Sequence, residues 1–218
     1  IVGLFGAMLM ILCGIIEQET AVHHIDFNTL GLLMGMMIIV NITSETGLFN
    51  FLAIWAAQKV KAQPIALLVV LSTITMVCSA LLDNVTTVLL TVPITFSITS
   101  QLKVDVMPYL ISQILASNIG GTATLIGDPP NIMIGSAVKE LTFVMFIEHL
   151  APIAIISMVV VMFIMAAIYR KDLVTTPALQ AELMQMDEKA AITDHALLKR
   201  ALFVLGLTIL GFFTHSFT

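Results

Sequence analysis

The chain has 218 residues, of which 59% are hydrophobic and only 11% are charged, and its formal net charge at pH 7 is −5. Soluble domains carry about 25% charged residues, so this composition excludes an ordinary soluble globular protein. We expect an integral membrane protein that lies in a lipid bilayer, and no nucleic-acid partner.

Seven apolar segments follow one another along the chain, and a membrane-spanning helix needs about 20 residues. They cover residues 1–16, 27–44, 64–82, 85–99, 107–138, 142–169 and 199–218. The shorter segment 46–57 is mildly amphipathic and is predicted to lie at the membrane interface, with Trp55 near the headgroups. Because apolar runs begin at Ile1 and continue near Thr218, we expect a piece of a longer chain.

The basic residues fall mainly on one side of the predicted topology. If the acidic loop 17–26 faces outwards, eight of the nine Lys and Arg residues lie inside, and only Lys139 lies outside. The positive-inside rule then makes the polar segment 170–198 a cytoplasmic linker. This linker is predicted to be helical over 175–195, with Pro177 in its first turn.

The first break in the apolar pattern is CSALLDNVTTVLLTVP, residues 78–93. Asp83 and Asn84 interrupt it, and basic residues of the same predicted side flank it, so the segment enters the membrane and returns. Two geometries fit. Either two full spans meet at a wet turn, or a re-entrant hairpin places its tip inside the membrane, and the sequence alone leaves both open.

The second break is SNIGGTATLIGDPPN, residues 117–131, in an apolar segment that covers 107–138. As one straight helix these residues would measure roughly 48 Å at 1.5 Å per residue, which exceeds the hydrocarbon core of roughly 30 Å. Glycines permit unusual backbone angles, and Pro129 and Pro130 block a continuing helix. Irregular backbone at this depth survives where it is packed in protein or lines a wet cavity, as in the sites of secondary transporters.

Carboxylates in the two breaks strengthen this interpretation. Asp83 and Asp128 would each cost about 2.5–3.5 kcal/mol at the centre of a membrane helix, and such residues usually face a cavity or a partner. A carboxylate that alternates between a bound proton and bound sodium is a suitable coupling group.

The two breaks also carry a resemblance to a known family. SALLDNVTTVLLTVP followed by SNIGGTATLIGDPPNIMI resembles the ion transporter superfamily. The similar branch contains arsenite permeases, one group of bacterial sodium/proton antiporters and the melanosomal P protein, with a citrate-transporter-like domain. The resemblance covers residues 25–170. It implies one repeat of an inverted-repeat transporter, a re-entrant hairpin over 64–99 and a broken helix over 107–138, and it also implies a homodimer in the bacterial inner membrane.

In the dicarboxylate-transporting relatives the hairpin tip reads Ser-Asn-Thr, and a serine four residues earlier helps to hold sodium. The resemblance places that serine at Ser79 and the tip at 83–85. Asn84 fits the pattern, whereas Asp83 replaces a neutral serine and Val85 replaces a hydroxyl. Because a fixed negative charge would repel a di- or tricarboxylate, this departure favours a cation, a proton or neutral arsenous acid.

The resemblance also implies the other site residues. The matching loop positions are Asn118, Gly120, Gly121, Thr122, Thr124, Gly127, Asp128 and Asn131. Sodium would be held by Ser79, Asp83, Asn84 and Gly127. Thr86 and Thr87 are expected to cap the returning arm of the hairpin. No cofactor is expected, and the coupling ion would be sodium or a proton.

Other classes of protein fit less of the pattern. Intramembrane aspartyl proteases use two membrane aspartates, one in a GxGD motif, but this chain reads LIGD and lacks the first glycine. We therefore predict no enzyme but a secondary active ion transporter that works by alternating access and exchanges arsenite or sodium for protons. An anion or dicarboxylate transporter and a passive ion channel remain as alternatives.

Overall fold

The computed structural model describes residues 2–138 and 140–214, and this part of the chain forms helices and no strand. The first six helices are α1 (Val2–Leu12), α2 (Gln18–His23), α3 (Phe27–Glu45), α4 (Leu48–Lys59), α5 (Pro64–Leu81) and α6 (Asn84–Leu102). They are followed by α7 (Met107–Thr122), α8 (Pro129–Ala137), α9 (Phe143–Tyr169), α10 (Pro177–Met184), η1 (Glu188–Ala191) and α11 (His195–Thr214). Lys139, which the topology places outside, is not among the described residues.

The predicted all-α polytopic membrane class is confirmed. Among the described residues, α5, α6, α9 and α11 are each long and apolar enough to cross a membrane. The pair α3 and α4, bent by 60°, would add a fifth span if it crosses as one unit.

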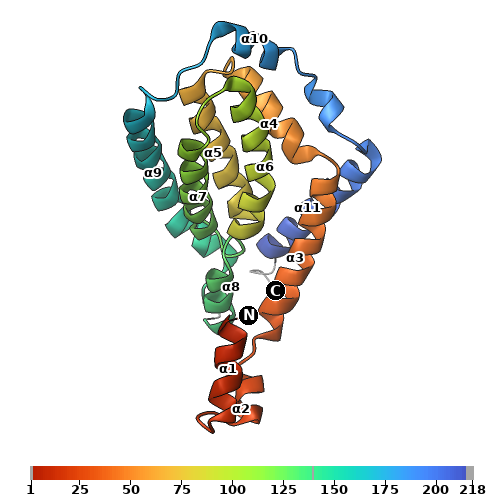
Figure 1. Ribbon diagram of the computed structural model, residues 1–218. Helices are drawn as coiled ribbons and strands as arrows, with labels where there is room; N and C mark the ends of the chain where they lie inside the picture. Colours follow the sequence, from red (N-terminus) through yellow and green to blue (C-terminus); the bar gives the residue numbers. More distant parts are fainter. Residues whose placement is uncertain (1, 139, 215–218) are drawn as a thin grey trace.

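The core of the molecule is the bundle of α5, α6 and α7, covered on one side by α9 (Figure 1). The side chains of Leu67, Leu102 and Tyr109 are fully buried there. The hydroxyl of Tyr109 donates to the carbonyl of Pro64 at 2.9 Å, which joins the beginnings of α5 and α7. Both helices therefore start at the same end of the bundle and run side by side to the two breaks.

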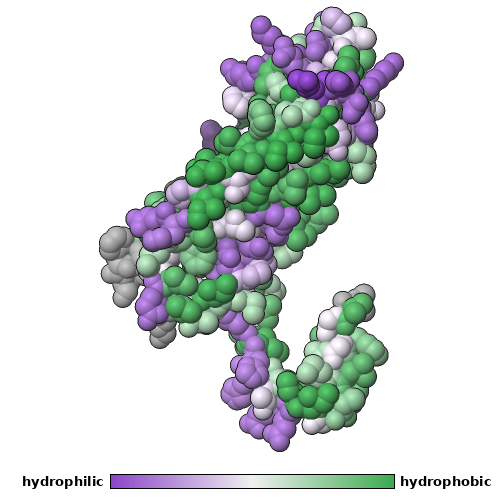
Figure 2. Space-filling model, turned by 90° about the vertical axis from the view of Figure 1, so that its left-hand side faces the viewer, coloured by the Kyte–Doolittle hydropathy of each residue, from purple (hydrophilic) through white to green (hydrophobic). Residues whose placement is uncertain are grey.

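The outer face of α9 is apolar and open. Large apolar side chains such as Ile156, Val159 and Phe163 are between 65% and 75% exposed. Figure 2 shows a broad hydrophobic band across the middle of this side of the molecule, with hydrophilic surface gathered at the upper end. Such a band suits contact with lipid tails, because apolar side chains exposed to lipid incur no free-energy cost.

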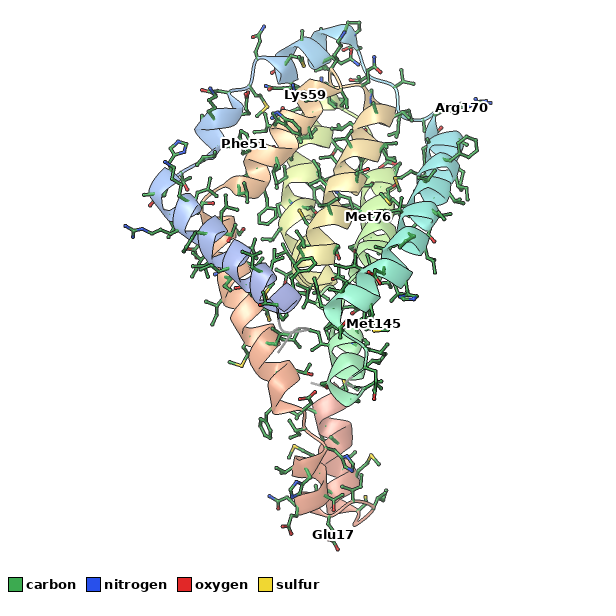
Figure 3. The ribbon with its side chains drawn as sticks, turned by 180° about the vertical axis from the view of Figure 1, so that it is seen from behind. Glu17, Phe51, Lys59, Met76, Met145 and Arg170 are labelled. Carbon is green, nitrogen blue, oxygen red and sulfur yellow. The ribbon has the colours of Figure 1, made fainter. Side chains whose placement is uncertain are left out.

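The charged ends of the bundle agree with the predicted topology. Lys59 and Arg170 lie at the same end of the molecule, and Glu17 lies at the opposite end (Figure 3). The basic end is also the end where the linker with α10 crosses the bundle (Figure 1).

The segment predicted at the interface, α4, packs on the bundle. α4 packs against both α5 and α6. Its buried residues are Phe49, Ala53, Ala56 and Ala57. Hydropathy did not reveal this, because small residues spaced three and four apart allow close helix packing without raising the apolar average. Trp55 keeps 41% of its surface exposed.

The first apolar run forms α1, which has 11 residues, none of them buried. At 1.5 Å per residue this helix is roughly 16 Å long, about half of the hydrocarbon thickness. The acidic loop that follows contains the short helix α2.

A left-handed glycine makes the corner between α3 and α4. Gly47 has a φ of +80°, a conformation that other residues rarely adopt. The linker closes this corner, since Thr193 donates its N–H to the carbonyl of Thr46 at 3.0 Å and its hydroxyl to that of Glu45 at 2.9 Å. Carbonyl groups that α3 leaves unpaired at its end are thereby satisfied.

The linker is less helical than the sequence predicts. Pro177 does occupy the first turn of α10, but α10 and η1 replace the continuous helix expected over 175–195. Two aspartates divide it, because the carboxylates of Asp187 and Asp194 accept backbone N–H groups and start η1 and α11. Helix α11 therefore begins just after Asp194, four residues before the predicted position 199.

Candidate functional site

The hairpin turns at Asp83, between α5 and α6. Its backbone is extended, and its carboxylate accepts the N–H of Thr86 at 2.7 Å, so Asp83 is the N-cap of α6. The expectation that Thr86 and Thr87 cap this helix is wrong. Thr86 supplies only its backbone N–H, and Thr87 is fully buried one position further along the helix.

The second break covers residues 123–128, between the end of α7 and the beginning of α8. Pro129 and Pro130 occupy the first turn of α8, where a missing N–H costs nothing. Gly120 and Gly121 lie in the last turn of α7 and have no positive φ, contrary to the prediction that they supply unusual angles. They are needed for another reason, which is close contact between backbones.

Three glycines let the break approach the hairpin. A Cβ on Gly120 would lie 2.2 Å from the carbonyl oxygen of Met76 in α5. A Cβ on Gly127 would lie 2.6 Å from the carbonyl oxygen of Gly121 and 2.8 Å from that of Ser79. Carbonyl oxygens from the hairpin and from the loop therefore converge where no side chain fits.

Hydrogen bonds tie the hairpin to the broken helix near both tips. The buried hydroxyl of Ser79 donates to the carbonyl of Ser117 at 2.6 Å. Thr124, in the loop, donates its hydroxyl to the carbonyl of Ala80. The sequence does not single out Ser117 and Ala80, because both accept these hydrogen bonds through main-chain carbonyls that any residue type carries.

The loop itself is held by Asn131 and Thr124. The side-chain amide of Asn131 donates to the carbonyls of Gly121 at 3.2 Å and of Thr124 at 3.0 Å. The hydroxyl of Thr124 also accepts the N–H of Gly127 at 3.1 Å. These bonds satisfy backbone groups that a broken helix leaves unpaired, so the loop has a defined shape.

One carboxylate stands at each break. Asp83 is the N-cap residue of α6 and Asp128 is the N-cap residue of α8, and both are partly exposed. The side chain of Asp128 makes no capping hydrogen bond, in contrast to that of Asp83.

An open groove lies beside the tip. It is lined by Asn84, Val85, Val88, Leu89, Ile114, Ser117 and Asn118. Thr122 is exposed, and its hydroxyl donates to the carbonyl of Ile119 in its own helix, so it makes no contact with the hairpin among the hydrogen bonds of the described residues. The other predicted site residues gather around the two breaks.

The tip lies part of the way along the molecule and not at its end. Figure 1 shows α8 and the first half of α3 continuing beyond the point where α5, α6 and α7 end. Both geometries left open by the sequence remain open, because α5 and α6 are each long and apolar enough to cross a membrane.

The whole chain, residues 1–218, matches the family model described as citrate transporter. The chain belongs to the citrate transporter family. This agrees with the ion transporter superfamily indicated by the two sequence breaks, which is a group of membrane transporters and not of enzymes.

Named relatives extend this finding. The chain is 39% identical over 216 residues to a 46 kDa membrane protein of Mycobacterium leprae and 38% identical over 218 residues to an uncharacterized transporter of Mycobacterium tuberculosis. These alignments cover 97% and 98% of the chain and 50% of each relative, so the chain spans half of their length. The human P protein is 48% identical over 115 residues, which are 53% of the chain and 14% of that protein.

Proposed function

We propose that this citrate transporter family member moves a small cation or a neutral hydroxide across the membrane in exchange for protons, with sodium and arsenous acid as the leading substrates. The observation that carries the proposal is that Asp83 and Asp128 each begin a helix at one of the two breaks, and that hydrogen bonds from Ser79 and Thr124 join these breaks. A pair of neighbouring carboxylates is stabilised by whatever reduces its charge, either a bound proton or a bound cation.

Competition at this pair provides the coupling. A proton and a sodium ion each reduce the negative charge of Asp83 and Asp128, so occupation by one disfavours the other. The carbonyl oxygens of Ser79 and Gly121 approach the backbone of Gly127, next to Asp128 in the chain, and carbonyl oxygens are the hard ligands that a sodium ion prefers. Alternating exposure of such a site to the two sides would exchange one ion for the other.

An anion such as citrate is the second candidate, because the family model bears its name and because two helices, α6 and α8, begin at the site. Helix N-termini attract anions through their unpaired N–H groups. In this chain Asp83 already accepts an N–H group of α6, and the first turn of α8 contains two prolines. Both ends are therefore less attractive to an anion than ordinary helix ends, which supports the cation over the tricarboxylate.

The test is flux through the full-length protein in proteoliposomes. Uptake of arsenite, sodium and citrate is compared with and without an imposed pH gradient. We expect arsenite or sodium movement that depends on the gradient and is accompanied by counter-movement of protons. Citrate uptake with no response to arsenite or sodium would overturn the proposal in favour of the anion, and ionic conductance without exchange would indicate a channel.

A further inference from the structure

The interior of the hairpin bundle is unusually polar for a membrane protein. Ten buried hydroxyl and amide side chains lie on α5, α6 and α7 alone. They are Ser72, Thr75, Ser79, Thr87, Thr91, Thr95, Thr99, Ser112, Gln113 and Ser117. We call this set the polar seam. It extends from the site described above towards the basic end of the bundle.

The seam follows one face of α6. Its four threonines, Thr87, Thr91, Thr95 and Thr99, are spaced by four residues, which places them above one another on a helix. All four are at most 7% exposed. They lead from the first turn after the hairpin tip to the last turn before Lys103, so the row extends along nearly the whole helix.

Two seam hydroxyls lack any hydrogen-bond partner among the described residues. These are the hydroxyls of Ser72 and Thr87, and both residues are 0% exposed. Each lies on the seam side of its helix, because Ser72 shares a face with Ser79 and Thr87 shares a face with Thr91. A buried hydroxyl without a partner costs about 1–3 kcal/mol, so a native structure usually supplies one, often ordered water.

The side-chain amide of Gln113 also lacks part of its hydrogen bonding among the described residues. Its side-chain nitrogen donates to the hydroxyl of Thr95 at 2.8 Å. The hydroxyl of Thr95 has one proton to donate. Its oxygen lies 3.1 Å from the amide oxygen of Gln113 and 2.9 Å from the carbonyl oxygen of Thr91, so only one of these two bonds forms at a time. Thr95 is the amide's only partner in the described hydrogen bonds, although a primary amide has two protons to donate and one oxygen to satisfy.

Ser72, Gln113 and Thr95 lie at one level of the bundle. Tyr109 bonds to Pro64 at one end of α7, and Ser79 bonds to Ser117 near the other end. Ser72 lies midway between Pro64 and Ser79, just as Gln113 lies midway between Tyr109 and Ser117. Ser72 is therefore at the height of the pair formed by Gln113 and Thr95.

We propose that ordered water occupies the polar seam and connects it into a hydrogen-bonded path along which protons move between the hairpin tip and the basic end of the bundle. Successive threonines of α6 are about 6 Å apart along the helix axis. Two O–H···O hydrogen bonds in series span about 5.5 Å, so one water molecule fits each step. A buried water makes about three hydrogen bonds. Ser72 and Gln113 offer free hydrogen-bonding groups at mid-bundle, and Thr87 offers one near the tip.

The transfer requires no other reactant. A proton joins the chain at one end, each O–H bond along the chain passes its proton to the next oxygen, and a different proton leaves at the other end. Hydroxyls and waters are restored by reorientation, so atoms and charge balance. The path rests on the proposed proton-coupled function, and it adds the route by which protons reach the carboxylates.

The first test concerns the water and does not depend on transport. In a high-resolution structure of the full-length protein we expect water density within about 3.0 Å of the hydroxyls of Ser72 and Thr87, the ordinary limit for O–H···O hydrogen bonds. A well-ordered seam that contains no water at these positions would overturn the proposal, whatever the protein transports.

The second test measures proton movement in proteoliposomes with a pH-sensitive dye inside. Thr95→Val and Gln113→Leu keep the size of the side chain but remove the groups that hold water, and we expect proton flux to fall about tenfold, which corresponds to about 1.4 kcal/mol on the barrier. Thr73→Val is the matched control, since Thr73 makes the same bond to its own helix, 2.8 Å to the carbonyl of Val69, but on an exposed face.

The outcomes separate the path from the function. Wild-type proton flux in both seam variants, with their folding confirmed by melting temperature, would rule out the path. Should the wild-type protein move no protons with any substrate, the proposed function fails, and the density at Ser72 and Thr87 still decides whether the seam is hydrated. Loss of flux in Thr73→Val as well would mean that lost hydroxyls act through general destabilisation, which also contradicts the path.

Discussion

The side-chain amide of Asn84 at the hairpin tip donates to the side-chain oxygen of Asn118 in α7 at 3.3 Å. The two residues are 34 positions apart in the chain, and each belongs to one of the two polar breaks. This contact joins the two breaks through their side chains. It adds to the hydrogen bonds that the hydroxyls of Ser79 and Thr124 donate to main-chain carbonyls. A site shared between two elements in this way changes whenever one element moves relative to the other.

Asp83→Asn should abolish the pH dependence of transport without unfolding the hairpin. Asparagine caps a helix about as well as aspartate, so the bond to the N–H of Thr86 is expected to persist while the charge is lost. The measurement is substrate flux against pH in proteoliposomes. Asp83→Ala is the comparison, because it removes the cap as well and should lower stability by about 1 kcal/mol. An unchanged pH profile in the asparagine variant would show that Asp83 is not the coupling carboxylate.

The sequence predicted the two breaks because their cause is local. Aspartate, asparagine and proline are incompatible with a continuous apolar helix, and the length of segment 107–138 requires an interruption. The boundaries of α6 and α8 lie at Asp83 and Pro129 for this reason.

What the sequence did not predict depends on contacts between distant segments. The burial of α4 rests on its alanines meeting α5 and α6, and the corner at Gly47 is closed by Thr193. The role of Gly120 is likewise set by the carbonyl of Met76 across the bundle. Composition and periodicity record which residues tolerate close contact, but they do not record which partner approaches.

Gly120→Ala should destabilise the protein by about 1–3 kcal/mol, the usual cost of overpacking. Its Cβ would lie 2.2 Å from the main-chain oxygen of Met76, and backbone cannot move aside as a flexible side chain can. Melting temperature in detergent checks this. Gly31→Ala is the control, since nothing lies within 4 Å of that Cβ in α3, and it should be neutral or stabilising by about 0.5–1 kcal/mol. Equal melting temperatures for Gly120→Ala and the wild type would contradict the close approach of α7 to α5.

Gly47→Ala should release the linker from the corner between α3 and α4. The new Cβ would collide with the carbonyl oxygen of Ala191, and the φ of +80° adds strain of about 1–2 kcal/mol. We expect limited proteolysis to cleave the segment near Ala191 faster than in the wild type. Gly14→Ala provides the control, because Gly14 has a φ of +67° with nothing within 4 Å, so it tests the strain without the collision. Linker cleavage at the wild-type rate in Gly47→Ala would refute the role of this contact.

Acid should loosen the start of α11 through Asp194. The pKa of this carboxyl is held below its usual range by the hydrogen bond from the N–H of Leu197, and also by that from Ala196. Because the pKa in the folded state is lowered, the stabilisation is fully present above the unfolded value of about 3.9 and is lost as the pH falls through the lower folded value. A spin label at Lys199 should therefore gain mobility as the pH falls from about 5 to about 2.5. Asp194→Asn keeps a capping oxygen without a charge, so its label mobility should not change over this range. If both proteins loosen at the same pH, the transition belongs to another group and Asp194 does not control the start of the helix.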